Sequence, residues 1–122
     1  MSTLRTQETE EGVMVCYFND AKILDEARIS QIGSDLVEMT TKTAGGKLLL
    51  NFEGVTFMSS HMIGKLVLLN KKCKAGKINL KFCNISPNVG EVFKIMRLNK
   101  VFDIQKDEEK ALKSFDKKGW FS

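Results

Sequence analysis

The stretch GVTFMSSHMIGKL occupies residues 54–66 and leads from a hydrophobic strand, expected at residues 47–52, into a helix. Ser59 and Ser60 stand at the turn between them, and serine is a favoured residue at the start of a helix. Apolar residues then recur at helical spacing, at Ile63 and Leu66 and beyond. The sequence therefore predicts a helix from the paired serines to Gly76, where a glycine ends it.

The same alternation of strand and helix extends over the rest of the chain. Strands are expected at residues 13–18, 47–52, 77–83 and 101–104. Helices are expected around residues 29–44, 59–76, 86–96 and 107–116, the third opened by Ser86 and Pro87. Strands that alternate with helices are typical of parallel crossovers. We therefore expect a small α/β domain with a mostly parallel or mixed β-sheet and about four helices packed on it.

The chain has 122 residues, which is enough for one domain; we expect a single domain over residues 1–116 and a loose tail over residues 117–122. Hydrophobic residues make up 43% and charged residues 28%, so the composition is that of an ordered globular protein. No apolar run is long enough to insert into a membrane. The polar, acidic stretch at residues 1–12 carries no signal for export, and the expected compartment is the cytoplasm.

The net charge is +4, and the basic residues cluster at Lys71, Lys72, Lys74, Lys77 and Lys81. Phe82 is the only aromatic residue near this cluster, so a solvated surface is favoured over direct binding of nucleic acid. Cys16, Cys73 and Cys83 are widely spaced, which favours buried thiols in a reducing compartment. With His61 as the one histidine, no metal site and no cofactor are expected.

Catalytic patterns are missing from the sequence: there is no GxSxG nucleophile elbow and no GxxxxGK[ST] phosphate loop. An enzyme is therefore the least favoured class. The paired serines at a helix N-terminus suit an anion, because free backbone N–H groups and the helix dipole favour negative charge. On position alone, a simple capping role for Ser59 or Ser60 is favoured over a phosphate-bearing role.

Residues 47–104 resemble a STAS domain of the bacterial anti-anti-sigma factor type. The resemblance rests first on residues 57–64 (FMSSHMIG), which occupy the position of that family's D-S-[ST]-G-[LI]-G motif. It rests also on residues 74–77 (KAGK), 84–87 (NISP) and 98–104 (LNKVFDI). It implies a non-enzymatic module that binds an anti-sigma factor, commonly a serine kinase of the histidine-kinase ATPase type, and so releases a sigma factor. The kinase phosphorylates a serine at the helix start, which weakens binding.

This sequence departs from the family pattern within that step. Aligned on Gly64, Ser60 takes the place of the first serine, His61 falls at the usual phospho-acceptor, and Met62 replaces a glycine. Ser60 is the preferred acceptor, with Ser59 as the alternative. The other possibility is that no phosphorylation occurs and that the domain is a STAS adaptor subunit of a stress-sensing or lipid-transport complex.

The expected partner surface combines the loop before the second helix, the exposed edge of that helix, and the loop after the first expected strand. Met58 and Met62 are taken as exposed apolar contacts on it, with core filling as the equal alternative. The full set is Asn19, Asp20, Lys22, Thr56, Met58, Ser59, Ser60, His61, Met62 and Lys65. The family resemblance implies a monomer.

Overall fold

The computed structural model describes residues 3–43 and 45–120, with side chains described as far as residue 115. The helices are α1 (Glu26–Lys42), α2 (Ser60–Ala75), α3 (Pro87–Ile95) and α4 (Glu108–Trp120), with a short 3₁₀ helix at Leu98–Lys100. The strands are β1 (Leu4–Glu8), β2 (Val13–Phe18), β3 (Lys22–Ile23), β4 (Lys47–Asn51), β5 (Phe57–Met58), β6 (Asn79–Cys83) and β7 (Ile104–Gln105). The expected α/β class with four helices is confirmed.

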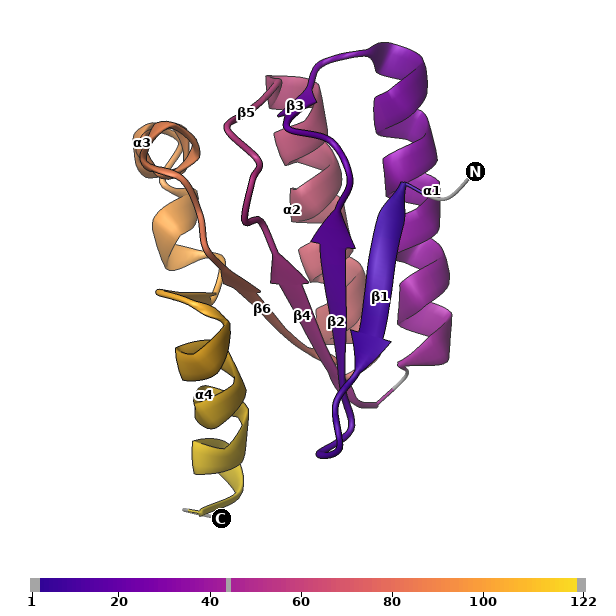
Figure 1. Ribbon diagram of the computed structural model, residues 1–122, viewed down its shortest axis with the longest axis vertical. Coiled ribbons are helices and arrows are strands. Elements are labelled where there is room, and N and C mark those ends of the chain that lie inside the picture. Colours follow the sequence, from indigo (N-terminus) through magenta and orange to yellow (C-terminus); the bar gives the residue numbers. More distant parts are fainter. Residues whose placement is uncertain (1–2, 44, 121–122) are drawn as a thin grey trace.

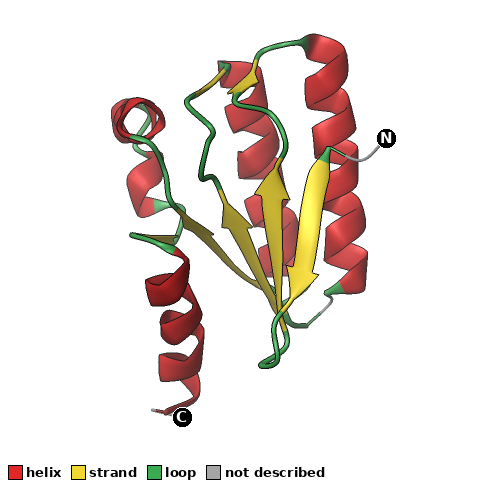
Figure 2. Ribbon diagram, in the orientation of Figure 1, coloured by secondary structure: helices red, strands yellow, loops and turns green. Residues whose placement is uncertain are grey.

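The main sheet has the strand order β1-β2-β4-β6-β7 (Figure 1). β2, β4, β6 and β7 run parallel, and β1 pairs antiparallel with β2 at one edge. Figure 2 shows the carboxyl ends of β2 and β4 pointing toward the end where α1 and α2 begin. Loops after parallel strands gather at this end of a sheet, which is where such folds commonly bind ligands and partners.

The core divides into two layers because successive strand residues face opposite sides of the sheet. Leu48, Leu50 and Phe52 face α1 and α2, in the larger cluster. Leu49 lies on the other face with Ala111 and Phe115 of α4. The larger layer holds a row of aromatic rings that runs across the sheet, in which Phe52 contacts Phe18 and Phe82, and Phe82 contacts Phe93 and Phe102.

A polar node lies where α4 meets the carboxyl ends of the strands. Asn51 is buried; its Nδ2 donates to Glu108 Oε1 at 2.8 Å, and its Oδ1 accepts from Glu53 N at 2.9 Å and Asn84 Nδ2 at 3.0 Å. The Tyr17 hydroxyl donates to the same Glu108 oxygen at 2.7 Å. Burial and this carboxylate raise the pKa of Tyr17 to about 12. The node thus ties β2, β4 and the residue after β6 to the first turn of α4.

Several boundaries differ from the expectation. β1 was not expected; four of its five residues are exposed, so it shows no apolar pattern. The loose tail predicted from residue 117 is wrong as far as residue 120, because α4 continues to Trp120; Lys117 and Lys118 are good helix formers. Residues 121 and 122 lie outside the described part of the chain.

The last strand is also shorter than predicted and lies later. Instead of a strand over residues 101–104, the chain forms the 3₁₀ helix and then β7, with Arg97 in a left-handed conformation (φ 62°) at the turn. Val101 is 45% exposed, while Phe102 is buried. The apolar run correctly predicted that Phe102 is buried. It contained no information about the turn before it.

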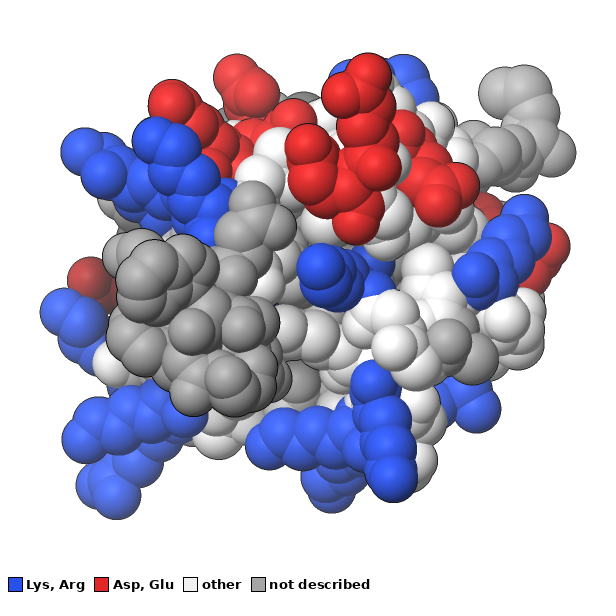
Figure 3. All heavy atoms as spheres, turned by 90° about the horizontal axis from the view of Figure 1, so that it is seen from below, with Lys and Arg blue, Asp and Glu red and all other residues white. Residues whose placement is uncertain are grey.

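The charge pattern agrees with a solvated surface for most of the lysine cluster. Lys71, Lys72, Lys74 and Lys77 are exposed. Seen from below, acidic side chains gather along one side of the molecule and basic ones stand in separate groups around the rest (Figure 3). Lys81 is the exception, because it is buried, bonds to Asp103 Oδ2 at 2.7 Å and lies over the Phe115 ring.

We expect Phe82→Ala to lower the free energy of unfolding by about 3–5 kcal/mol, because it removes a buried ring with aromatic neighbours on several sides. Urea denaturation followed by circular dichroism measures the change. Phe57→Ala is the matched control: that ring is 45% exposed, and its loss should cost less than about 1 kcal/mol. Equal losses for the two variants would contradict the assigned core.

Candidate functional site

Two loops meet above the carboxyl ends of the strands through a small parallel sheet. β3 pairs with β5, so that Lys22 stands opposite Phe57 and Ile23 opposite Met58. Thr56 N donates to Ala21 O at 2.8 Å and Ser59 N donates to Ile23 O at 3.0 Å. The expectation that the loop after β2 lies beside the start of α2 is confirmed, although the two-residue strands themselves were not expected.

The paired serines occupy different positions at the start of α2. Ser59 is the N-cap: it is half-buried, and its Oγ accepts from Met62 N at 3.4 Å. Ser60 is the first helical residue and its side chain is exposed. The capping role weighed from the sequence therefore belongs to Ser59, and Ser60 remains the more accessible hydroxyl.

Two side-chain contacts flank these serines on the α1 side. His61 Nδ1 donates to Glu26 Oε1 at 2.8 Å, and both side chains are largely exposed. Arg28 holds Asp20 in a two-point contact, with Nε–Oδ2 at 2.7 Å and Nη2–Oδ1 at 2.8 Å. The hydrogen bonds from Arg28 lower the pKa of Asp20 below its ordinary value. The loop after β2 is therefore fastened to α1 as well as to β5.

The prediction that Met58 and Met62 form exposed partner contacts is wrong. Met58 is 4% exposed and Met62 is fully buried. Met58 lies opposite Ile23, which is also buried, so this face of β5 points inward. Met62 is the third residue of α2 and belongs to its buried side with Ile63 and Leu66. Core filling, the alternative stated from the sequence, is the role that the structure shows.

The other residues predicted for this surface are accessible to different degrees. Thr56, Ser60, His61, Asn19 and Lys22 are exposed. Asp20, Ser59 and Lys65 are half-buried, and the stem of Lys65 lies against Gly33 of α1. The structure thus brings most of the predicted set to one end of the molecule, with Lys65 turned toward the groove between α1 and α2.

Sequence reasoning missed the exposed apolar residues of this end. Phe57 is 45% exposed and Leu24 is 49% exposed. Phe57 borders a groove of about 390 Å³ between β5, the start of α2 and α3, whose lining includes Ile63, Val89 and Val92. The sequence signal that could have found Phe57 is the alternation of side chains along a strand. In a two-residue strand only one of Phe57 and Met58 can face the core, but residues 57–58 were expected to be a connecting segment.

The geometry is that of a small α/β domain with an accessible serine at the start of its second helix. The STAS domain family model matches residues 6–111. The chain belongs to the STAS domain family. This confirms the resemblance drawn from the motifs within residues 47–104. No match was found among curated protein sequences.

Solved structures with the same fold include several STAS proteins. An anti-sigma-factor antagonist (STAS) domain protein from Planctomyces limnophilus superposes with a TM-score of 0.82 at 24% identity, over 91% of this chain and 96% of that one. RsbS from Moorella thermoacetica gives 0.80 at 13%, over 97% and 98%. The anti-sigma factor antagonist SpoIIAA in its unphosphorylated form gives 0.74 at 20%, over 93% and 96%. At these identities the likeness establishes the fold.

The described residues contain neither a candidate metal cluster nor a candidate membrane span. No group of three or more His, Cys, Asp or Glu side chains within them could hold a metal ion. None of the helices in the same part of the chain combines the length and apolar character of a membrane span. The three cysteines are buried and unpaired, and burial raises their pKa, to about 12 for Cys16 and Cys83 and about 11 for Cys73.

We expect Arg28→Gln to destabilise the domain at neutral pH but not in acid. A carboxyl whose folded pKa lies below its ordinary 3.8 adds stability above that pH, and the contribution is lost as pH falls through the folded pKa. The unfolding free energies of the two proteins should therefore converge below about pH 4. Urea titrations at several pH values measure this. Asp20→Asn and the variant that carries both substitutions complete a double-mutant cycle. A difference independent of pH would exclude the pair as its cause.

Proposed function

We propose that this STAS domain is an anti-sigma factor antagonist: a non-enzymatic cytoplasmic module that binds an anti-sigma factor and thereby releases a sigma factor. The observation that carries the proposal is an exposed Ser60 at the first position of α2, in a chain that matches the family over residues 6–111. Structural neighbours described as anti-sigma factor antagonists support the same function. The domain works as a monomer, and its partner is a serine kinase of the histidine-kinase ATPase type.

The partner contacts the end of the molecule at which β3, β5 and the start of α2 meet. Leu24 and Phe57 supply exposed apolar area, and the groove beside Phe57 can receive an apolar side chain. Thr56, His61 and Lys22 supply polar groups around it. An apolar centre with a polar rim is the usual organisation of a protein–protein interface.

Ser60 is the phospho-acceptor in this proposal, in preference to Ser59. The Ser59 hydroxyl is half-buried and caps α2, so a kinase would have to break that hydrogen bond to reach it. A phosphate on Ser60 adds a charge of about −1.5 to −2 beside the helix N-terminus, where the dipole stabilises it. The same charge falls within the partner surface and opposes an apolar contact there.

We expect Ser60→Asp to weaken binding of the anti-sigma partner at least about tenfold, because a carboxylate must then be desolvated in the interface. Ser60→Ala should bind as the wild type does. Calorimetry with the partner recovered on the tagged domain measures both affinities.

Ser59→Asp is the matched control, since aspartate also caps a helix and leaves Ser60 in place. Phosphopeptide mapping after incubation with the partner and ATP should then find the phosphate on Ser60. Equal affinities for Ser60→Asp and Ser60→Ala would contradict the switch.

A constitutive adaptor in a stress-sensing or lipid-transport complex is the second candidate. Its support is the altered motif: His61 stands in the usual acceptor register and is held by Glu26, and Met62 fills buried space where the family has a glycine. Such a domain would keep its partner in the presence of ATP. Recovery of the complex from lysate with and without ATP separates the two functions.

A further inference from the structure

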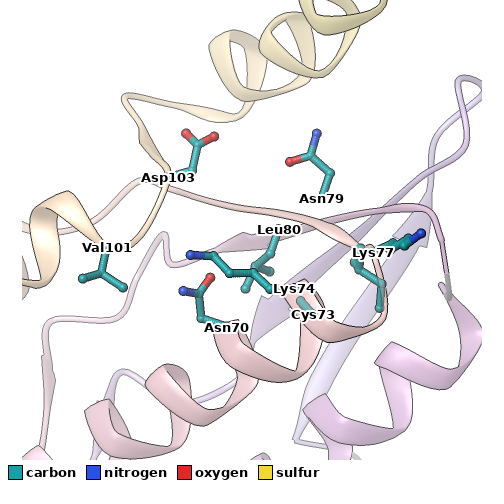
Figure 4. A pocket seen from close by; sticks show the side chains of 9 residues that line it. Asn70, Cys73, Lys74, Lys77, Asn79, Leu80, Val101 and Asp103 are labelled. Carbon is teal, nitrogen blue, oxygen red and sulfur yellow. The ribbon is translucent and has the colours of Figure 1, made fainter.

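A second site lies at the other end of α2, away from the paired serines. A cavity of about 480 Å³ opens between the C-terminal half of α2, β6 and the segment that leads into β7 (Figure 4). Pockets for small molecules usually occupy about 300–1,000 Å³, so this cavity has the size for one. Asn70 is ten residues from Ser60, about 15 Å along the helix, so the cavity lies outside the proposed partner surface.

Asn70 is a polar group of the cavity wall whose side chain is largely buried. Its side chain projects from α2 into the cavity (Figure 4) and is 7% exposed. No side-chain hydrogen bond joins its amide to any residue in the described part of the chain. An amide offers two donors and one acceptor oxygen. No buried side-chain N or O atom of the described residues lacks a partner, so the Asn70 amide is reached from the cavity. Its hydrogen bonds are therefore directed to whatever fills the cavity.

The charge available to a ligand is positive. Lys74 extends across the cavity toward Asn70 (Figure 4), and no ion pair holds it among the residues described. Asp103 also lines the cavity, but its Oδ2 accepts from Lys81 Nζ at 2.7 Å and its Oδ1 from Gln105 Nε2 at 2.7 Å. The Asp103 charge is thus compensated within the protein, whereas the Lys74 charge is not.

Lys77 and Asn79 also line the cavity, and the rest of its wall is apolar. Leu80 and Cys73 are buried beneath the cavity, and Val101 stands half-exposed at its rim. Burial raises the pKa of the Cys73 thiol to about 11, so at neutral pH it is uncharged and adds apolar surface. A fitting molecule therefore combines one negative group, for Lys74 and Asn70, with a short aliphatic body.

We propose that this cavity binds a small aliphatic carboxylate. Lys74 pairs with the carboxylate, the Asn70 amide donates to one of its oxygens, and the aliphatic chain lies against Leu80 and Val101. The site is independent of the proposed partner binding, and its test can fail or succeed whatever the outcome for Ser60.

The experiment is an NMR titration of the ¹⁵N-labelled domain with sodium butyrate, at ionic strength matched with sodium chloride. Saturable shifts are expected in the Asn70 side-chain NH₂ signals and in the backbone amides of Cys73, Leu80 and Val101. Butylammonium, of similar size and opposite charge, should cause none. No saturable shift with butyrate, or equal shifts with butylammonium, overturns the proposal. Saturable binding of inorganic phosphate that is tighter than that of butyrate overturns the assignment to a carboxylate.

Two variants separate the site from general effects of charge. Lys74→Gln should weaken butyrate binding about fivefold, whereas Lys71→Gln, an exposed lysine of α2 that does not line the cavity, should leave it unchanged. Asn70→Leu should abolish binding while the melting temperature stays close to that of the wild type, because no side-chain hydrogen bond to a described residue is lost. Equal losses for the two lysine variants, or full binding by Asn70→Leu, would overturn the site.

Discussion

The pairing of β3 with β5 is the constraint on which the candidate partner surface depends. Neither two-residue strand could persist alone, yet the backbone hydrogen bonds from Thr56 and Ser59 to Ala21 and Ile23 join the loop after β2 to the loop after β4. They fix where α2 begins, and therefore which serine caps it and which is exposed. Arg28 and Asp20 fasten the same loop to α1. An accessible Ser60 is thus a result of tertiary structure as well as of local sequence.

Most of the fold could be predicted from the sequence because its signals are strong and local. The strand at residues 13–18 is a continuous apolar run, and residues 48–50 are three consecutive leucines. Ser86 with Pro87 marks a helix start that the structure reproduces, with Ser86 Oγ accepting from Val89 N. β1 was missed because an edge strand with one buried residue has no apolar pattern. Its place in the sheet comes from pairing with β2, and no local window of sequence contains that information.

The candidate site was less predictable, because exposure depends on which face of a short element meets the core. Thr56, Ser60 and His61 were placed correctly on the surface, since polar residues at a helix start usually are exposed. Met58 was misplaced and Phe57 overlooked because residues 57–58 were not treated as a strand, in which only one of the two side chains faces the core. Met62 was misplaced because it was assigned to the loop, although it lies on the buried side of α2 with Ile63 and Leu66. The Asn70 cavity had no sequence signal at all. It forms only when the chain before β7 turns back over α2.

The two edges of the main sheet differ in a way that bears on how the domain meets other proteins. β1 presents Arg5, Thr6, Gln7 and Glu8 along one edge, and β7 at the other edge is two residues long. A strand from another chain needs a long, flat, unpaired edge to extend a sheet, and charged or very short edge strands oppose it. Addition of a foreign strand, whether by aggregation or by domain exchange, is therefore disfavoured at both edges. Recognition is left to loops and helix ends, which can be altered without changing the sheet.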